Sequence, residues 1–96
     1  MKIKRTDVFA NWLRKLKNRR AKAIIVNHID RMEDGNMGKV DSVGSGVYEK
    51  KINYGPGYRL YFCQLDDTWI LLLCGGDKST QQDDIKQAKE LKRGLI

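Results

Sequence analysis

The sequence is poor in residues on which several classes of protein depend. It has two cysteines, one histidine and one proline among 96 residues. Cys63 and Cys74 each stand in an apolar run, without the close Cys/His spacing of a zinc site. We therefore expect two buried, reduced thiols, no bound metal and no other cofactor. With His28 alone, the chain cannot use a pair of histidines as the acid and base of a ribonuclease.

Long hydrophobic stretches are also absent. The apolar run at residues 70–74 is far too short to cross a bilayer. The first residues, MKIKRTDVF, lack the apolar segment of a signal peptide. We therefore expect a cytoplasmic protein that makes no use of the membrane.

Positive charge is abundant. Nineteen Lys and Arg residues outnumber twelve Asp and Glu residues, which gives a formal net charge of +7. Such an excess favours a polyanionic partner, either nucleic acid or an acidic protein, although a basic surface can also serve solubility alone. Several cations gather near the start of the predicted second helix, where they form either a solvated face or a contact for RNA: Arg19, Arg20 and Lys22.

The hydrophobic periodicity predicts one α+β domain over residues 1–96. Residues 2–5 form a short first strand, residues 7–17 a helix capped by Thr6, and Asn18 caps a second helix that ends near residue 33. Residues 40–46 offer a weak strand and a Gly-rich turn. Further strands follow at residues 47–54, 58–65 and 68–74, and GGDKST breaks the last one. Thr80 and Asp83 then open a C-terminal helix as a capping box. The expected fold is a short N-terminal strand, a two-helix hairpin, an antiparallel sheet of about four strands and a C-terminal helix.

The stretch NYGPGYRLYF predicts a hairpin with Gly55 at its centre, which places Lys51 directly opposite Arg59. Like charges in such a pair destabilise a sheet, and a bound phosphate would offset the repulsion. Substituting either cation should therefore leave the fold no less stable. Tyr54 and Tyr58 lie near the hairpin tip, where an aromatic ring can stack on a base.

The next turn is predicted to bring a third cation, Lys78, close to Lys51 and Arg59. Pairing Leu65 with Thr68 puts Arg59 opposite Cys74, so that the strand leads directly to Lys78. The same pairing places three apolar side chains on the face of Lys51: Ile70, Leu72 and Cys74. Three cations then converge on one uncovered patch. The prediction depends on register, because a slip of one residue sends every side chain to the other face.

Three segments, WLRKL, GPGYRLYF and LLLCGGDKSTQ, occur here in an order and at distances that resemble the RelE/ParE superfamily of toxins. The resemblance runs from about residue 9 to residue 91, and the HigB-like addiction module killer proteins are the most similar branch. It implies a toxin of a type II toxin-antitoxin system that cleaves mRNA on the ribosome. It also implies a cognate HigA-like antitoxin with a helix-turn-helix domain.

The resemblance assigns catalytic roles to three residues: Lys51, Arg59 and Lys78. Arg59 would hold the scissile phosphate and its developing charge, while the two lysines are candidates for general base and general acid during attack by the 2′-hydroxyl. Glu49 stands where some relatives have a second strand lysine, and we count it among the RNA-contacting residues. Two alternatives stay open, a ParE-like inhibitor of DNA gyrase that is not an enzyme, and an inactive RNA-binding relative.

Overall fold

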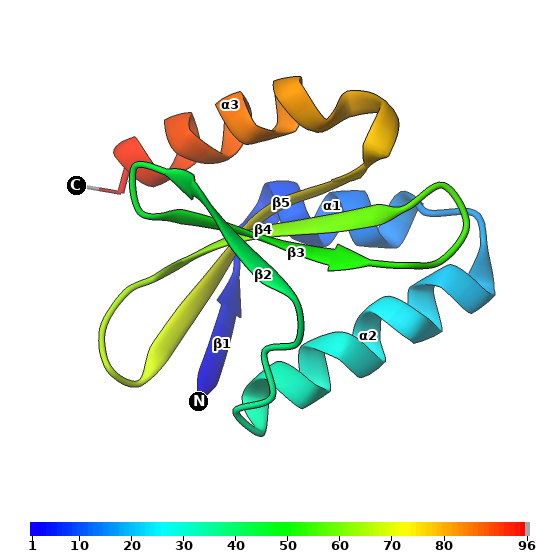
Figure 1. Ribbon diagram of the computed structural model, residues 1–96, viewed down its shortest axis with the longest axis horizontal. Coiled ribbons are helices and arrows are strands. Elements are labelled where there is room, and N and C mark those ends of the chain that lie inside the picture. Colours follow the sequence, from blue (N-terminus) through cyan, green and yellow to red (C-terminus); the bar gives the residue numbers. More distant parts are fainter. Residues whose placement is uncertain (96) are drawn as a thin grey trace.

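The computed structural model describes residues 1–95, in which a sheet lies between helices on both of its faces (Figure 1). The elements follow in the order β1 (Lys2–Arg5), α1 (Asp7–Lys15), α2 (Arg19–Glu33), β2 (Val40–Gly44), β3 (Val47–Ile52), β4 (Tyr58–Gln64), β5 (Trp69–Asp77), a short 3-10 turn (Lys78–Thr80) and α3 (Gln81–Arg93). The expected α+β class is confirmed. No helix within residues 1–95 has the length and apolar character needed to cross a membrane.

The sheet has five strands in the order β1-β5-β4-β3-β2, and β1 runs parallel to β5 while the other pairs are antiparallel. The expected antiparallel sheet of about four strands is thus too simple, because the N-terminal strand joins the edge. Thr6 links this strand to the next helix. Its hydroxyl donates to the carbonyl of Leu73 at 2.6 Å and accepts the amide of Phe9 at 3.0 Å, which caps α1.

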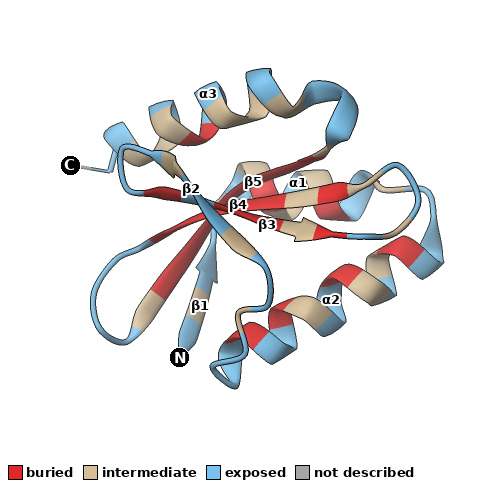
Figure 2. Ribbon diagram, in the orientation of Figure 1, coloured by how far each residue is buried: buried red, intermediate tan, exposed pale blue. Residues whose placement is uncertain are grey.

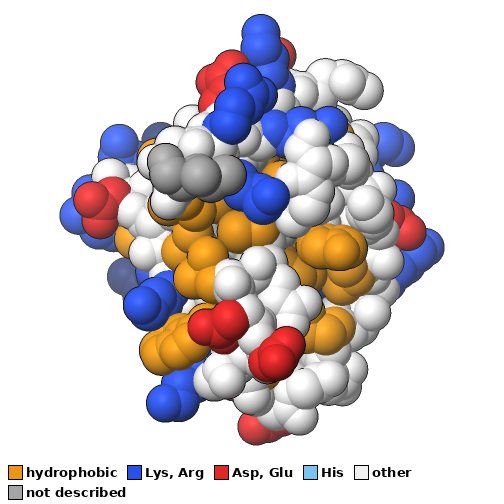
Figure 3. Space-filling model, turned by 90° about the vertical axis from the view of Figure 1, so that its left-hand side faces the viewer, with side chains coloured by type: hydrophobic (Ala, Val, Ile, Leu, Met, Phe, Trp, Pro, Cys, Tyr) orange, Lys and Arg blue, Asp and Glu red, His pale blue; other side chains and the backbone are white. Residues whose placement is uncertain are grey.

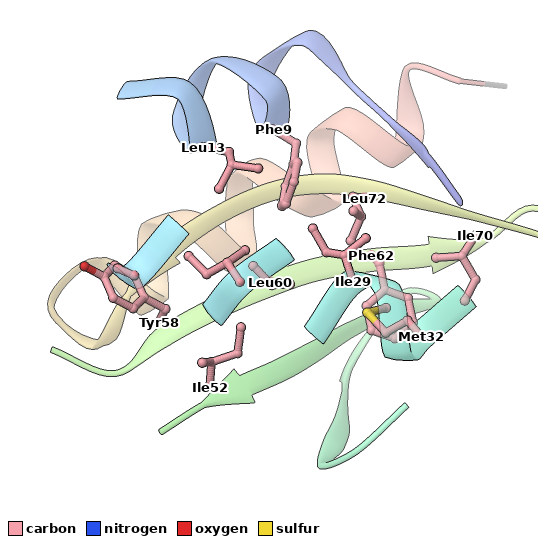
Figure 4. Packing of buried hydrophobic residues seen from close by; sticks show 12 residues of the cluster. Phe9, Leu13, Ile29, Met32, Ile52, Tyr58, Leu60, Phe62, Ile70 and Leu72 are labelled. Carbon is pink, nitrogen blue, oxygen red and sulfur yellow. The ribbon is translucent and has the colours of Figure 1, made fainter. Parts of the chain in front are cut away.

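Helices α1 and α2 cover one face of the sheet, and α3 covers the other (Figure 2). α1 ends at Lys15, two residues earlier than expected, and Asn18 caps α2 as predicted by accepting the amide of Ala21. The side chains between the sheet and the first two helices form the larger core (Figure 4): Phe9, Leu13, Ala21, Ile25, Ile29, Met32, Ile52, Tyr58, Leu60, Phe62, Ile70 and Leu72.

The smaller core under α3 contains both cysteines, which are buried and free. Burial raises the pKa of Cys63, and it raises the pKa of Cys74 to about 12. Neither thiol is therefore a reactive thiolate at neutral pH.

The first hairpin has the predicted register, with Lys51 opposite Arg59, but the second does not. Asp66 accepts the amides of Thr68 and Trp69, and the turn closes between Leu65 and Trp69 instead of Leu65 and Thr68. This shift by one residue turns two side chains toward α1 and α2 instead of α3: Ile70 and Leu72. A bulge after Tyr61 then returns Cys74 to the predicted face and brings Gly76, not Cys74, opposite Arg59.

Gly75 and Gly76 continue β5 instead of breaking it, which corrects the expected end at residue 74. A Cβ atom on Gly75 would overlap the ring of Trp12 in α1, and one on Gly76 would overlap the carboxylate of Asp84 in α3. The glycines thus let helices approach both faces of the strand. Thr80 does not form the expected capping box, because its hydroxyl donates to Asp84 and caps no amide.

Gly75→Ala should destabilise the protein because the added methyl group has to displace the Trp12 ring. We expect a loss of about 1–3 kcal/mol in the free energy of unfolding, measured by urea denaturation. Gly94→Ala is the control, since a Cβ there meets only ordinary contacts at 3.6 Å and 3.8 Å. Equal stability of the two variants would contradict this account of the close packing.

Candidate functional site

A hollow of about 690 Å³ opens between α2, the segment at residues 36–39 and the β3–β4 hairpin. Six Lys and Arg side chains line it, together with His28: Arg31, Lys39, Lys50, Lys51, Arg59 and Lys78. Among residues 1–95, no Asp or Glu contributes to the lining. A concave surface with cations of this density and no lining carboxylate favours an anionic ligand.

The three cations predicted to be catalytic all line this hollow. The hairpin positions two of them, since Lys51 and Arg59 are direct cross-strand neighbours. Gly57, at a φ of +81°, helps to close the turn by donating its amide to the carbonyl of Tyr54 at 3.0 Å. A Cβ on Gly57 would lie 3.7 Å from Cβ of Lys78, so the segment after β5 passes beside the hairpin tip.

Glu49 lies in the interior, with an exposed fraction of 2%. Its carboxylate accepts hydrogen bonds from the Tyr61 hydroxyl at 3.0 Å and from Nε2 of Gln81 at 2.9 Å. It also lies 4.0 Å from both Nζ of Lys51 and Nε of Arg59. Because Glu49 is buried and does not line the hollow, it cannot contact RNA there, which corrects that assignment. Glu49 instead supplies negative charge next to the two like-charged residues.

This buried carboxylate changes the expected energetics of the Lys51–Arg59 pair. Lys51 also lies 3.7 Å from the exposed carboxylate of Asp41, so two acidic groups offset the repulsion. Burial and the neighbouring Glu49 raise the pKa of Tyr61, which keeps its hydroxyl protonated as a donor to Glu49. Removing Arg59 would therefore not merely relieve repulsion. It would take a cation away from a carboxylate in the protein interior.

The guanidinium of Arg59 is largely buried, but two of its nitrogens lack a hydrogen-bond partner among residues 1–95. Only 12% of the side chain is exposed, and Nε and Nη1 are buried without a hydrogen-bond partner within residues 1–95. Buried donors of this kind carry a desolvation cost. A ligand oxygen that reached them would remove that cost, so the residue is suited to an anion.

Sequence reasoning missed a second group of basic residues in the hollow, consisting of the cations Arg31 and Lys50 and the neutral imidazole of His28. Residues 24, 28 and 31 follow the helical spacing of one face of α2, and this spacing was the available signal. Lys50 alternates with Lys51 in β3 and therefore lies on the helical side of the sheet, where a lysine is unusual because that side faces the core. Burial lowers the pKa values of Lys50 and His28, with Arg31 contributing to both shifts, so His28 is neutral at pH 7.

The remaining residues expected to contact RNA are more scattered. Tyr54 and Tyr58 line the hollow, but Tyr58 is only 8% exposed and belongs to the core, where it packs edge-on against Trp12. Arg19, Arg20 and Lys22 lie outside the hollow in the first turn of α2. Lys22 donates to the carbonyl of Arg14 at 2.7 Å. The structure therefore brings Lys51, Arg59 and Lys78 to one hollow but leaves this helical group apart.

The face at the left of Figure 1, away from the β3–β4 turn, differs from the hollow in its side-chain composition. Hydrophobic side chains gather there among Lys, Arg, Asp and Glu side chains (Figure 3). Within residues 1–95, no cluster of three His, Cys, Asp or Glu side chains is arranged to hold a metal ion. The hollow, by contrast, is lined by Lys and Arg side chains and by no Asp or Glu within residues 1–95.

Comparison with known proteins gives one extensive match. No family model matches the chain. A protein of Haemophilus influenzae described as an uncharacterized protein is 50% identical over 95 residues, which cover 99% of this chain and 96% of that protein. The similarity thus extends over all the elements that form the hollow.

Proposed function

The chain belongs to the same family as the Haemophilus influenzae protein, and we propose that it is an mRNA-cleaving toxin of a type II toxin-antitoxin system that acts on the ribosome. The observation that carries the proposal is that Lys51, Arg59 and Lys78 line one hollow to which no carboxylate of residues 1–95 contributes. The partners proposed with it are the ribosome, its mRNA and a HigA-like antitoxin with a helix-turn-helix domain.

Strand scission in this site begins with attack of the RNA 2′-hydroxyl oxygen on the adjacent phosphorus. The bond to the 5′-oxygen of the next nucleotide breaks, one proton leaves the 2′-hydroxyl, and one proton reaches the leaving oxygen. The products are a 2′,3′-cyclic phosphate and a 5′-hydroxyl. Arg59 carries paired donors that suit two phosphoryl oxygens, and a phosphate that reached its buried Nε or Nη1 would have its developing negative charge stabilised there.

Lys51 and Lys78 supply the other charges. Lys51 lies directly across the hairpin from Arg59 and is partly exposed, so its ammonium group can approach the same phosphate. Lys78 is exposed beside the hairpin tip. We assign the proton transfers to these two lysines as a pair, without dividing the roles of base and acid between them.

The proposal predicts growth arrest when the protein is expressed alone, and fragments of mRNA that end in a 2′,3′-cyclic phosphate. Primer extension on cellular mRNA and analysis of the ends of the fragments test this. Cleavage by the purified protein in a reconstituted translation system should need no metal ion beyond the Mg²⁺ that keeps the ribosomes assembled. A supercoiling assay with DNA gyrase serves as the counter-test. Arrest with intact mRNA and inhibited gyrase would refute the proposal and favour the ParE-like alternative.

A further inference from the structure

From the arrangement of the hollow, we infer a second phosphate subsite in which Lys50 and Arg31, with His28 beside them, bind the RNA strand next to the scissile phosphate. This inference rests on the proposed function for the identity of the ligand. Its physical basis is a group of basic side chains that is separate from Lys51, Arg59 and Lys78.

Lys50 is the central residue of this subsite. Only 2% of the residue is exposed, but unlike Glu49 it lines the hollow, and its ammonium group donates to the carbonyl of Met37 at 2.6 Å. An ammonium group has three donors, and this is the one hydrogen bond that the described residues accept from it. A Cβ on Gly38 would lie 2.6 Å from Nζ of Lys50, so the glycine leaves room for the side chain beside the loop.

The surroundings of Lys50 contain basic side chains instead of a counterion. Arg31 and His28 line the same hollow, and no salt bridge to Lys50 occurs within residues 1–95. Anchoring the loop at Met37 would require only a neutral donor, whereas a buried ammonium group has a large desolvation cost without a negative partner. A phosphate in the hollow would supply that partner.

The position of Lys50 and Arg31 relative to Lys51, Arg59 and Lys78 indicates how one RNA strand can contact both groups. Lys50 and Lys51 are consecutive in β3, so their side chains leave opposite faces of the sheet. Both nevertheless line the same hollow, together with Tyr54 at the hairpin tip. A flexible single-stranded RNA that crosses this end of β3 can place one phosphate at Arg59 and a neighbouring phosphate at Lys50 and Arg31.

The test measures binding of a short, fluorescently labelled single-stranded RNA whose riboses carry 2′-O-methyl groups, so that it cannot be cleaved. Fluorescence anisotropy gives the affinity of the wild type, Lys50→Met and Arg31→Gln at several salt concentrations. Each variant should bind roughly tenfold more weakly at low salt, because a charged hydrogen bond is lost. The slope of log affinity against log salt should become shallower by about 0.7 for each lost phosphate contact.

Lys86→Gln is the matched control, since Lys86 is exposed on α3 and does not line the hollow. It should keep the wild-type salt slope. Because Lys50→Met changes an interior residue, thermal unfolding must show that it is folded, and Arg31→Gln provides a second reading from an exposed position.

The outcomes separate this inference from the proposed function. If the wild-type protein binds the RNA but cleaves no mRNA, the same variants still decide whether the subsite exists. Wild-type affinity and salt slope in both Lys50→Met and Arg31→Gln would overturn the subsite and leave the proposed cleavage standing. Failure of the wild-type protein to bind the RNA at low salt would overturn the subsite as well.

Discussion

Arg59→Ala is expected to lower the rate of mRNA cleavage on the order of 100-fold or more and to abolish growth arrest. The reason is that the guanidinium is the group best placed to hold the phosphate as its charge increases during attack. Arg59→Lys should fail as well, since an ammonium group keeps the charge but cannot make two parallel hydrogen bonds. Initial rates of cleavage in a purified translation system measure both effects.

A loss of activity is informative only if the variant remains folded. We expect Arg59→Ala to lower the free energy of unfolding by about 1–3 kcal/mol, because Glu49 loses a neighbouring cation but keeps its bonds to Tyr61 and Gln81. Arg93→Ala is the control, an exposed arginine in the last turn of α3. If Arg59→Ala is folded and cleaves mRNA at the wild-type rate, the proposed mechanism is wrong.

Glu49→Ala should produce the largest loss of stability, about 3–5 kcal/mol in the free energy of unfolding. The substitution would deprive Tyr61 and Gln81 of their acceptor and leave the largely buried Arg59 without its nearest carboxylate. Stabilities of small proteins lie in the range of about 5–15 kcal/mol, so this is a large fraction of the total. Urea denaturation followed by circular dichroism measures it.

The control for Glu49 is a carboxylate in a similar ion pair at the surface. Asp41 lies 3.7 Å from Nζ of Lys51, but its side chain is 55% exposed. Asp41→Asn should therefore cost at most about 1 kcal/mol. Glu49→Gln, which keeps the volume and one acceptor oxygen, should fall between Asp41→Asn and Glu49→Ala. Similar costs for Asp41→Asn and Glu49→Ala would show that burial does not determine the role of Glu49.

Much of the site could be predicted from local pattern. The Gly55-Pro56-Gly57 turn fixes the register of the first hairpin, and with it the position of Lys51 opposite Arg59. The second turn was mispredicted because Asp66 bonds two backbone amides and lengthens the loop. The bulge after Tyr61 was equally invisible in the alternation of side chains, although it brought Cys74 back to the expected face.

The sequence pattern did not reveal which charged side chains are buried. Glu49 alternates like a surface residue along β3, and only the arrival of Gln81 from α3 and Tyr61 from β4 encloses it. Lys50 is buried because the segment at residues 36–39 approaches it, and nothing in the strand pattern encodes that approach. Burial of a charged side chain depends on elements distant in sequence, which a pattern read along the chain does not contain.

The parallel pairing of β1 with β5 has a consequence for synthesis of the protein. Residues 2–5 find their partners only at residues 69–72, so the first strand to leave the ribosome waits for the last strand before it can be incorporated. Contacts of such long sequence separation slow folding, because a large loop must close before they form. A nascent chain that stops before Trp69 lacks the strand to which α1 and α3 both attach. Any activity of this fold therefore begins only after nearly the whole chain has been made.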